Sequence, residues 1–499
     1  METQHPMLFA AERAEIGGDI LGLVTSGMYD TPLASVREYV QNSADAYASV
    51  GNFHGKLEVH TDVANLRLTI RDYGPGLSAD EAIIALLPIA RSQKIPGLHR
   101  GFRGIGRLSG LAFADSVKFV TRNETSEHAF SVTWDGACLR EKVAQGELAS
   151  SAIKHSVSCM SIDAEEYPQT FFEVQIEGIA RHAAPHLLNR ERLRRYVAEV
   201  CPVPFGNKFP FSTEVAKYLG ERERIMELQV HVDGEPNRIE RGFTGSFKVS
   251  ESREDLCRYI EFIEVPSIDG RGSAAAGWFA HSSYLGAIHK TAGIRGIRAR
   301  VGNIQVGDES TMDLLFDESR FNRWCIGEIH ILDRRILPNA RRDYFEPNPH
   351  LRNLESKLAP HLKRLSAQCR QASRERIHNR KLAGQLDAID DCHKLAESNL
   401  ADRNLALEVC TNAIDRITKL RSRLESLEEP DAEMEARARA SENALLALKC
   451  DIERSRLDDS NGASSQLAQS IFRTLARHLK SDVQAAQVVE EVMKDMLPQ

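Results

Sequence analysis

The sequence predicts an α+β protein in which two mixed α/β domains precede an all-helical region. Helical and strand-like periodicities alternate up to about residue 130, and strand-like runs continue to about residue 350. Beyond Pro349 the strand signals stop, and long, charged helical sequence runs to the C-terminus. Because a chain of 499 residues is too long for one ordinary hydrophobic core, we expect separate domains at residues 1–130, 131–350 and 351–499.

Composition and charge are those of a folded protein that works in water. Hydrophobic residues make up 42% and charged residues 27% of the chain, which excludes a fibrous or disordered protein. The formal net charge of −7 argues against a polyanion binder over the whole length, so nucleic acid is not the expected partner. The nine cysteines stand singly, without the spacing of a zinc site. With no secretory signal and no apolar run long enough to span a bilayer, the expected compartment is the cytoplasm and no membrane contact is expected.

The two mixed domains are built from short helical and strand-like segments. In the first domain, apolar residues recur at helical spacing over residues 16–24 and 32–50, and β-like runs follow at residues 56–60 and 66–71. In the second domain, β-like runs lie at residues 171–176, 227–232, 259–265 and 326–332.

Apolar residues repeat at alternating spacings of three and four in the C-terminal region. One series runs from Cys410 to Leu427 and another from Met434 to Ile452, with Pro430 between them. This pattern predicts two coiled-coil helices that fold back on each other. A last amphipathic helix is expected from Leu467 to Leu479. The apolar stripe fits an intramolecular hairpin and a seam between two protomers equally well.

Three residues suited to chemistry lie on the second predicted helix. Glu38, Asn42 and Asp45 are four and three positions apart, so they share one helical face. A carboxylate, an amide and a second carboxylate in this arrangement can supply a water-activating base, a neutral oxygen ligand for Mg²⁺ and a further polar anchor. Taken alone, such a triple is more often a solvated stripe on a surface helix.

A strand end followed by two glycines forms the second motif. Asp72 ends a β-like run, and Gly74 and Gly76 follow it. Glycines let the backbone turn sharply and approach a ligand closely. The Asp72 carboxylate is therefore expected to face a ligand, where it can accept a hydrogen bond from an exocyclic amine such as that of adenine. A DxGxG sequence by itself is more often a simple tight turn.

The glycine-rich residues 97–110 form the third motif. Gly101, Gly104 and Gly106 precede an apolar helical run, and successive backbone N–H groups at a helix start can form a nest for a triphosphate. The segment is not a P-loop, since no GK[ST] ends it, and it is not a dinucleotide fingerprint. A glycine-rich loop alone is weak evidence, so the order of the three motifs matters more than any one of them.

Together and in this order, the three motifs resemble the nucleotide site of the gyrase, heat-shock chaperone, histidine kinase and MutL (GHKL) superfamily. The resemblance covers about residues 8–125 and, locally, residues 320–346. It implies a Bergerat-type α/β sandwich ATPase domain followed by an α/β transducer domain. Residues 92–94 and 101–104 are also similar to MutL. The similarity to the heat-shock protein 90 chaperones rests on Phe9 to Glu12, Tyr29 to Pro32, Arg37 and Glu38, Gln41 to Ser43, and Asp45 with Ala46.

The resemblance also implies roles for individual residues. Glu38 is expected to act as the general base, Asn42 to bind Mg²⁺ and Asp72 to recognise adenine. The loop from residue 101 to 106 is expected to wrap the phosphates as a lid. The residues expected to bind ATP are Asn42, Asp45, Asp72, Gly74, Gly76, Ser92, Lys94, Gly101, Phe102, Arg103, Gly104, Ile105 and Gly106.

A second match lies in residues 327–332 and 337–343. They are similar to the chaperones' middle-domain segment, whose arginine reaches the terminal phosphate. Arg342 aligns with that arginine, so a catalytic role is expected for it, with Arg341 as the alternative. Without the resemblance, these two residues fit a surface basic pair.

The resemblance implies an ATPase that closes as a homodimeric clamp on a protein client or effector, as heat-shock protein 90-like proteins do. Residues 351–499 do not match the chaperones and are closer in arrangement to the Microrchidia ATPases, which favours dimerisation or partner docking there. Two alternatives stay open: a DNA-associated clamp of MutL, Microrchidia or topoisomerase type, and a nucleotide-sensing scaffold of a bacterial defence module. A histidine kinase is least favoured, because the ATP-binding motifs precede the histidines of the helical sequence.

Overall fold

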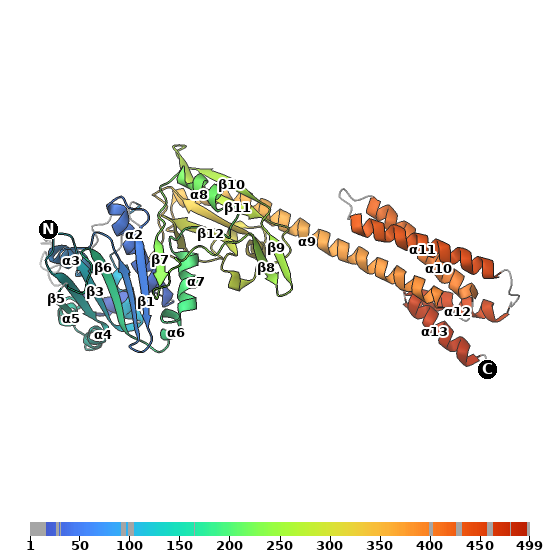
Figure 1. The fold of residues 1–499 in the computed structure, drawn as a ribbon, viewed down its shortest axis with the longest axis horizontal. Helices are drawn as coiled ribbons and strands as arrows, with labels where there is room; N and C mark the ends of the chain where they lie inside the picture. Colours follow the sequence, from blue (N-terminus) through green and yellow to red (C-terminus); the bar gives the residue numbers. More distant parts are fainter. Residues whose placement is uncertain are drawn as a thin grey trace, which may run out of the picture. The chain divides into compact units, whose positions relative to one another are not determined.

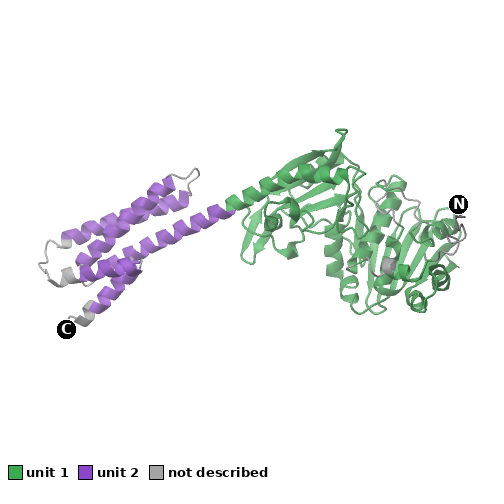
Figure 2. Ribbon diagram, turned by 180° about the vertical axis from the view of Figure 1, so that it is seen from behind, with its two compact units in different colours: residues 1–372 green, residues 373–499 purple. Residues whose placement is uncertain are grey.

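A computed structural model describes residues 16–25, 29, 31–90, 96–97, 104–163, 165–398, 403–425, 432–456, 463–479 and 481–496. The chain divides into two compact units, residues 1–372 and 373–499 (Figure 2). The N-terminal region is a mixed α/β sandwich, a second β-sheet domain follows it, and the C-terminal region is helical (Figure 1). The predicted fold class is confirmed.

Seven strands form the first sheet. Alternate side chains of each strand face the core: Leu57 and Val59 of β1, and Leu68 and Ile70 of β2, are buried. β1 and β7 pair in parallel, and the other neighbours pair antiparallel. In spatial order the strands are β5 (Val157–Ile162), β4 (Ala129–Asp135), β3 (Ala114–Arg122), β6 (Phe171–Ile179), β2 (Arg67–Asp72), β1 (Lys56–Asp62) and β7 (Gln229–Val232).

This sheet extends well past the domain boundary expected at residue 130. β4 begins at that point, and β6 lies between β3 and β2 near the middle of the sheet. The β-like runs at residues 171–176 and 227–232 therefore belong to the first sheet rather than to the second. The boundary was misplaced because strand pairing depends on contacts between residues distant in sequence, which local periodicity does not report.

Helices pack on the first sheet and position its functional residues. Val36, Val40 and Ala44 of α2 are spaced four apart and lie fully buried in the same core as Leu57 and Ile70. The opposite side of α2 is thereby left for polar residues. The helical elements of this region are α1 (Asp19–Thr25), α2 (Leu33–Ser49), α3 (Ala79–Leu86), the 3₁₀ segment η2 (Gly106–Ala112), α4 (Gly136–Ala144), α5 (Ala149–Ser156), α6 (Ala184–Leu187) and α7 (Arg190–Val200).

The second domain is a five-stranded sheet with an accompanying hairpin. Ile297, Ala299 and Ile329 are fully buried on the central strands β12 and β14. The sheet has the spatial order β10 (Tyr259–Pro266), β11 (Ser273–His281), β14 (Ile326–Ile331), β12 (Gly296–Val301) and β13 (Ile304–Val306). The remaining elements are α8 (Ser212–Gly220), the hairpin of β8 (Ser246–Ser250) and β9 (Arg253–Leu256), and the 3₁₀ segments η3 (Lys290–Ala292), η4 (Asp313–Leu315) and η5 (Ser319–Trp324).

A buried cluster of charges lies where the two sheets of the first unit meet. Glu328 of β14 is 0% exposed, and its carboxylate pairs with the guanidinium groups of Arg241 and Arg300. Burial by itself would raise the pKa of Glu328, but Arg241, Arg300 and a hydrogen bond with His330 together hold that pKa well below its ordinary value. We call Glu328, Arg241, Arg300 and Asn303 the Glu328 cluster, because Asn303 accepts a hydrogen bond from Arg241.

The Glu328 cluster ties the second sheet to the polypeptide around the first sheet. All three connecting hydrogen bonds end on backbone carbonyl groups, so they fix the path of the main chain. They run from Arg241 Nε to Val203 (3.0 Å), from Arg300 Nη2 to Glu199 (2.7 Å) and from Asn303 Nδ2 to Met226 (2.6 Å).

The C-terminal unit consists of packed helices. α10 and α11 contact each other along their lengths, and Ala413, Ile417, Leu420 and Leu424 of the apolar stripe are buried within the unit, together with Leu445 of α11. Leu427 and Pro430 lie outside the described residues. No helix in the described part of the chain combines the length and the apolar character that crossing a lipid bilayer requires. The helices are α9 (Pro349–Glu397), which crosses the boundary at residue 372, α10 (Arg403–Glu425), α11 (Ala432–Arg456), α12 (Ala463–Leu479) and α13 (Asp482–Met496).

Candidate functional site

A cavity of about 390 Å³ lies between α2, the end of β2 and the loop that follows β14. Its volume falls in the range of roughly 300–1,000 Å³ that is usual for small-molecule sites. The cavity brings together residues from all three predicted motifs and from the distant arginine segment. The predicted site residues that line it are Glu38, Asn42, Asp45, Asp72, Gly76, Gly104, Ile105, Gly106 and Arg342.

Of the other six predicted residues, the structure describes only Gly74, which does not line the cavity. The backbone N–H of Gly74 donates to Oδ1 of Asp72 (3.0 Å), so this glycine helps to hold the carboxyl group that lines the cavity. The other five lie outside the described residues: Ser92, Lys94, Gly101, Phe102 and Arg103.

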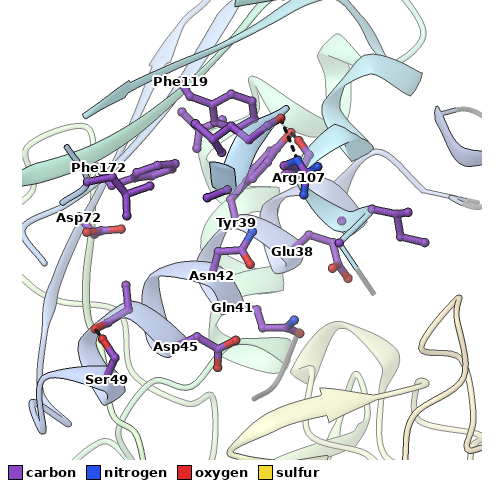
Figure 3. Close-up of a pocket in the computed structure, with 18 of the residues that line it drawn as sticks. Glu38, Tyr39, Gln41, Asn42, Asp45, Ser49, Asp72, Arg107, Phe119 and Phe172 are labelled. Carbon is purple, nitrogen blue, oxygen red and sulfur yellow. Dashed lines mark hydrogen bonds between the residues drawn. The ribbon is translucent and has the colours of Figure 1, made fainter. Parts of the chain in front are cut away.

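The polar side of α2 forms one wall of the cavity. Glu38, Gln41, Asn42 and Asp45 all line it, and Figure 3 shows their side chains along this helix. The helix is held in place by its apolar side in the core, so the polar residues are presented from a rigid element. The predicted helical face carrying a carboxylate, an amide and a second carboxylate is therefore present.

Asp72 is a buried carboxyl group at the end of β2. It is 2% exposed, and burial raises its pKa from 3.8 to about 6, although hydrogen bonds from Ser43 and from the Gly74 N–H act in the opposite direction. After Asp72 the backbone turns at Gly76, which has a φ of +63° and passes close to β3. Only glycine fits there, because a Cβ would lie 1.9 Å from the carbonyl oxygen of Arg122. The carboxyl group is thus aimed into the cavity by a backbone that only glycine permits.

The raised pKa of Asp72 predicts a pH dependence in the acidic range. If the ionised carboxylate accepts the adenine amine, adenosine affinity should be constant above about pH 7 and fall by up to about tenfold per pH unit below pH 6. Calorimetric titration with adenosine between pH 5 and 8 measures this, because adenosine lacks phosphates that titrate in the same range. Because the folded-state pKa of Asp72 lies above the unfolded value, the contribution of Asp72 to the stability of the ligand-free protein is present below about pH 4 and is lost as pH rises to about 6. An adenosine affinity that does not change with pH would count against the assignment of Asp72.

The end of the glycine-rich segment lies directly against Glu38. A Cβ at Gly106 would lie 2.3 Å from Oε2 of Glu38, so no larger residue fits without displacing the carboxylate. Gly104 has a φ of +70°, which favours glycine there as well. The second half of the predicted loop therefore borders the cavity next to the acidic residue of α2.

Arg342 of the second domain reaches the same carboxylate. Its Nε lies 3.5 Å from Oε1 of Glu38, and its side chain is buried. Burial lowers the pKa of Arg342, and the Glu38 carboxylate opposes this effect. Arg37 also connects α2 to the segment around Arg342. Its Nη2 lies 3.3 Å from Oε1 of Glu38 and donates to the carbonyl oxygen of Arg341 (3.3 Å).

The backbone around Arg342 is held in an unusual conformation. Arg342 has a φ of +58°, which costs a residue with a side chain about 1 kcal/mol or more. Its carbonyl oxygen accepts a hydrogen bond from the N–H of Gly307 (2.8 Å), and its N–H donates to the carbonyl oxygen of Asn339 (3.1 Å). These bonds turn Arg342 toward the cavity, whereas the neighbouring Arg341 is exposed.

Several lining residues were not predicted from the sequence. Arg107 is buried, donates to the carbonyl oxygens of Leu86 and Pro88, and has a pKa lowered to about 10 by burial. Its position beside Gly106 was the one signal available. Apolar lining residues look like ordinary core positions in the sequence. Tyr29 and Gln41 lie in segments that carry the resemblance to the chaperones, but the resemblance assigned no role to either. The missed residues include Tyr29, Tyr39, Gln41, Phe119, Phe172, Val174, Pro338 and Asn339.

Comparison with known proteins agrees with this geometry. Residues 30–164 match a family model described as histidine kinase-, DNA gyrase B-, and HSP90-like ATPase. A DNA mismatch repair protein MutL from Anaplasma phagocytophilum is 34% identical over 113 residues, which cover 21% of this chain and 17% of that protein.

Two chaperone proteins HtpG are also similar. The protein from Albidiferax ferrireducens is 31% identical over 157 residues, or 26% of this chain and 23% of the relative. The protein from Polaromonas naphthalenivorans is 28% identical over 212 residues, or 37% of this chain and 32% of the relative. The matched segments span less than a third of each of these three proteins. The chain therefore carries a histidine kinase-, DNA gyrase B- and HSP90-like (GHKL) ATPase domain, with distant similarity to HtpG and MutL.

Proposed function

We propose that this protein binds ATP with Mg²⁺ in the cavity on α2, hydrolyses it, and uses the cycle to close a homodimeric clamp on a protein client or effector. One observation carries the proposal. A carboxylate of the ATPase domain, Glu38, and a cation of the second domain, Arg342, meet 3.5 Å apart in a cavity of nucleotide-compatible size. In this proposal the position of the second domain affects hydrolysis, because that domain carries Arg342, which contacts the proposed general base Glu38.

The proposed mechanism assigns each part of the cavity to one part of the nucleotide. Asp72 accepts the adenine amine, and the backbone N–H groups from Gly104 to Gly106 face the phosphates. Glu38 takes the proton of the attacking water, and Arg342 stabilises the negative charge that develops on the transferred phosphoryl group. Catalysis then rests on positioning and electrostatics, as phosphoryl transfer generally does.

The donor chemistry of this wall fits Mg²⁺. Asn42 and Asp45 offer oxygen atoms, which Mg²⁺ prefers, and Mg²⁺ commonly uses few protein ligands together with substrate phosphates. No group of three or more His, Cys, Asp or Glu side chains suited to a metal occurs among the described residues, which agrees with an ion held largely by a nucleotide. Asn42 is the proposed protein ligand. The ion, when bound, neutralises phosphate charge.

A protein client is favoured over DNA as the cargo. The net charge of −7 disfavours extended contact with a polyanion, and two of the relatives are chaperones by name. The similarity to a mismatch repair protein supports the second candidate, a clamp on DNA. DNA binding that weakens steeply with added salt would select that candidate.

Arg342→Ala is expected to slow ATP turnover by about tenfold to a hundredfold, because a cation aimed at the transition state is removed. ATP affinity should change little, since the adenine contact and the Mg²⁺ ligand remain. Steady-state hydrolysis assays and calorimetric titration with ATP separate the two effects. Arg341→Ala is the matched control, because this exposed neighbour does not line the cavity and the substitution keeps the backbone carbonyl that Arg37 contacts, so its turnover should equal that of the parent. Equal loss of affinity and turnover in Arg342→Ala would contradict the proposed role.

A further inference from the structure

One buried side chain in the cavity lacks a hydrogen-bond partner among the described residues. Gln41 of α2 is 0% exposed, and within the described part of the chain neither its Oε1 nor its Nε2 has a hydrogen-bond partner. Buried amides are almost always hydrogen-bonded, because losing the bonds to water without replacement costs free energy. An amide left unpaired in a cavity therefore indicates a ligand that completes it.

A second unpaired group faces the same cavity from the second domain. Asn339 lines the cavity, and its buried Oδ1 has no hydrogen-bond partner in the part of the chain that the structure describes, while its Nδ2 donates to Oδ1 of Asp343 (2.6 Å). Asn339 lies three residues before Arg342, on the loop after β14. Two independent segments thus bring unsatisfied amide atoms to one cavity.

The position of Gln41 on α2 places it at the hydrolytic end. It stands three residues after Glu38 and four before Asp45, so the three share one side of the helix. Figure 3 shows Glu38, Gln41 and Asp45 following one another along this side, with Asp72 lying apart from them. Burial lowers the pKa of Arg342, whereas the carboxylates of Glu38 and Asp45 raise it. Gln41 stands between these two carboxylates along the helix, and Glu38 lies 3.5 Å from Arg342. The amide of Gln41 therefore belongs to the phosphate end rather than to the adenine end.

We infer that Gln41 is a further catalytic residue, which holds the attacking water against the terminal phosphate of ATP. A carboxamide accepts and donates at the same time, so Oε1 accepts one hydrogen of the water and Nε2 donates to an oxygen of the phosphate. The second hydrogen of Nε2 is available to Oδ1 of Asn339. This inference rests on the proposed ATPase function.

The proposed step balances without any change in Gln41. The water oxygen forms a bond to the terminal phosphorus, and the bond from that phosphorus to the bridging oxygen breaks, with its electron pair staying on ADP. The water proton that does not contact Gln41 passes to Glu38. Gln41 neither gains nor loses a proton, so it acts by orientation alone.

Gln41→Met tests the inference, because the substitution should raise the melting temperature and lower the turnover number. Methionine has a similar shape and needs no hydrogen bonds, so the melting temperature of the ligand-free protein should rise. The turnover number should fall by about tenfold to a hundredfold, while the ATP dissociation constant stays within about threefold. Binding of ADP with vanadate, an analogue of the transition state, should weaken, whereas binding of ADP alone should not.

A matched substitution separates this effect from a general response to methionine. Gln368→Met changes a half-buried glutamine on α9 that does not line the cavity, so turnover should equal that of the parent. Parental turnover in Gln41→Met would overturn the inference alone. A fall in both melting temperature and turnover would show a structural role and would also overturn it. Absence of ATP hydrolysis by the parent protein would instead refute the proposed function, and this inference with it.

Discussion

Glu38→Ala is expected to bind ATP as tightly as the parent protein and to hydrolyse it at least about a hundredfold more slowly. General bases contribute roughly 10²- to 10⁴-fold to rate, and Glu38 is the carboxylate that both Gly106 and Arg342 approach. The substitution keeps Asp72, the proposed adenine contact, and Asn42, the proposed Mg²⁺ ligand, so ATP affinity should not fall. Calorimetric titration with ATP and a phosphate-release assay measure the two quantities separately.

Two further variants make this result specific. Glu38→Gln keeps the shape of the side chain and an oxygen for Arg342 but cannot take a proton, so it should lose hydrolysis to a similar extent. Asp72→Asn should lose ATP binding, because a neutral amide oxygen accepts a weaker hydrogen bond from the adenine amine than the carboxylate does, and the new NH2 group can face that amine as a second donor. Turnover in Glu38→Ala equal to that of the parent would remove Glu38 from the proposed mechanism.

The hydrolysis-deficient protein also tests the proposed clamp. With saturating ATP and Mg²⁺, Glu38→Ala should accumulate in the closed state, because the step that reopens it is blocked. Affinity capture with this variant, with and without ATP, is expected to retain client or effector in the ATP-bound sample. Chemical cross-linking of the same samples reports whether two copies of the chain associate on ATP binding.

Glu328→Gln is expected to lower the free energy of unfolding by about 3–5 kcal/mol. The substitution removes the negative charge that two buried arginines share, and breaking a buried ion pair by removing one partner typically costs this much. Arg241 and Arg300 are almost fully buried, so water cannot replace the lost partner. Urea denaturation followed by circular dichroism measures the change.

A surface pair provides the matched control for this effect. Asp317 lies 3.7 Å from Lys363, and both side chains are substantially exposed, so Asp317→Asn should change the free energy of unfolding by less than about 1 kcal/mol. A loss of similar size in both variants would mean that net charge, rather than the Glu328 cluster, sets the stability. An unchanged stability in Glu328→Gln would mean that the arginines find other partners.

The sequence was most informative where function places several residues on one regular element. Glu38, Asn42 and Asp45 could be predicted together because helical periodicity converts their spacing directly into a shared face. Asp72 could be predicted because a strand end followed by glycines fixes where a side chain points. The segment around Arg342 was recognised only by resemblance, since nothing local indicates that residue 342 returns to a helix near residue 38.

The sequence was least informative about contacts between distant segments. Glu328, Arg241 and Arg300 look like ordinary charged residues near or within strands, and only the folded chain reveals that they are buried together. Gln41 was overlooked for a different reason: an amide between two acidic residues fits a solvated helix surface, and its lack of partners is visible only in three dimensions. Both cases concern polar groups whose environment depends on tertiary structure rather than on local pattern.

The place of β6 in the first sheet has a consequence for synthesis of the protein. β2 and β3 are separated by β6 in the sheet, yet the ribosome completes both strands before β6 begins, 49 residues after Arg122 (171 − 122). At roughly 5–20 residues per second, the nascent chain would leave the facing edges of β2 and β3 unpaired for about 2–10 s, and such edges can pair with other chains. A gene fragment cut at residue 164, where the family match ends, would make that interval permanent and should yield aggregated protein.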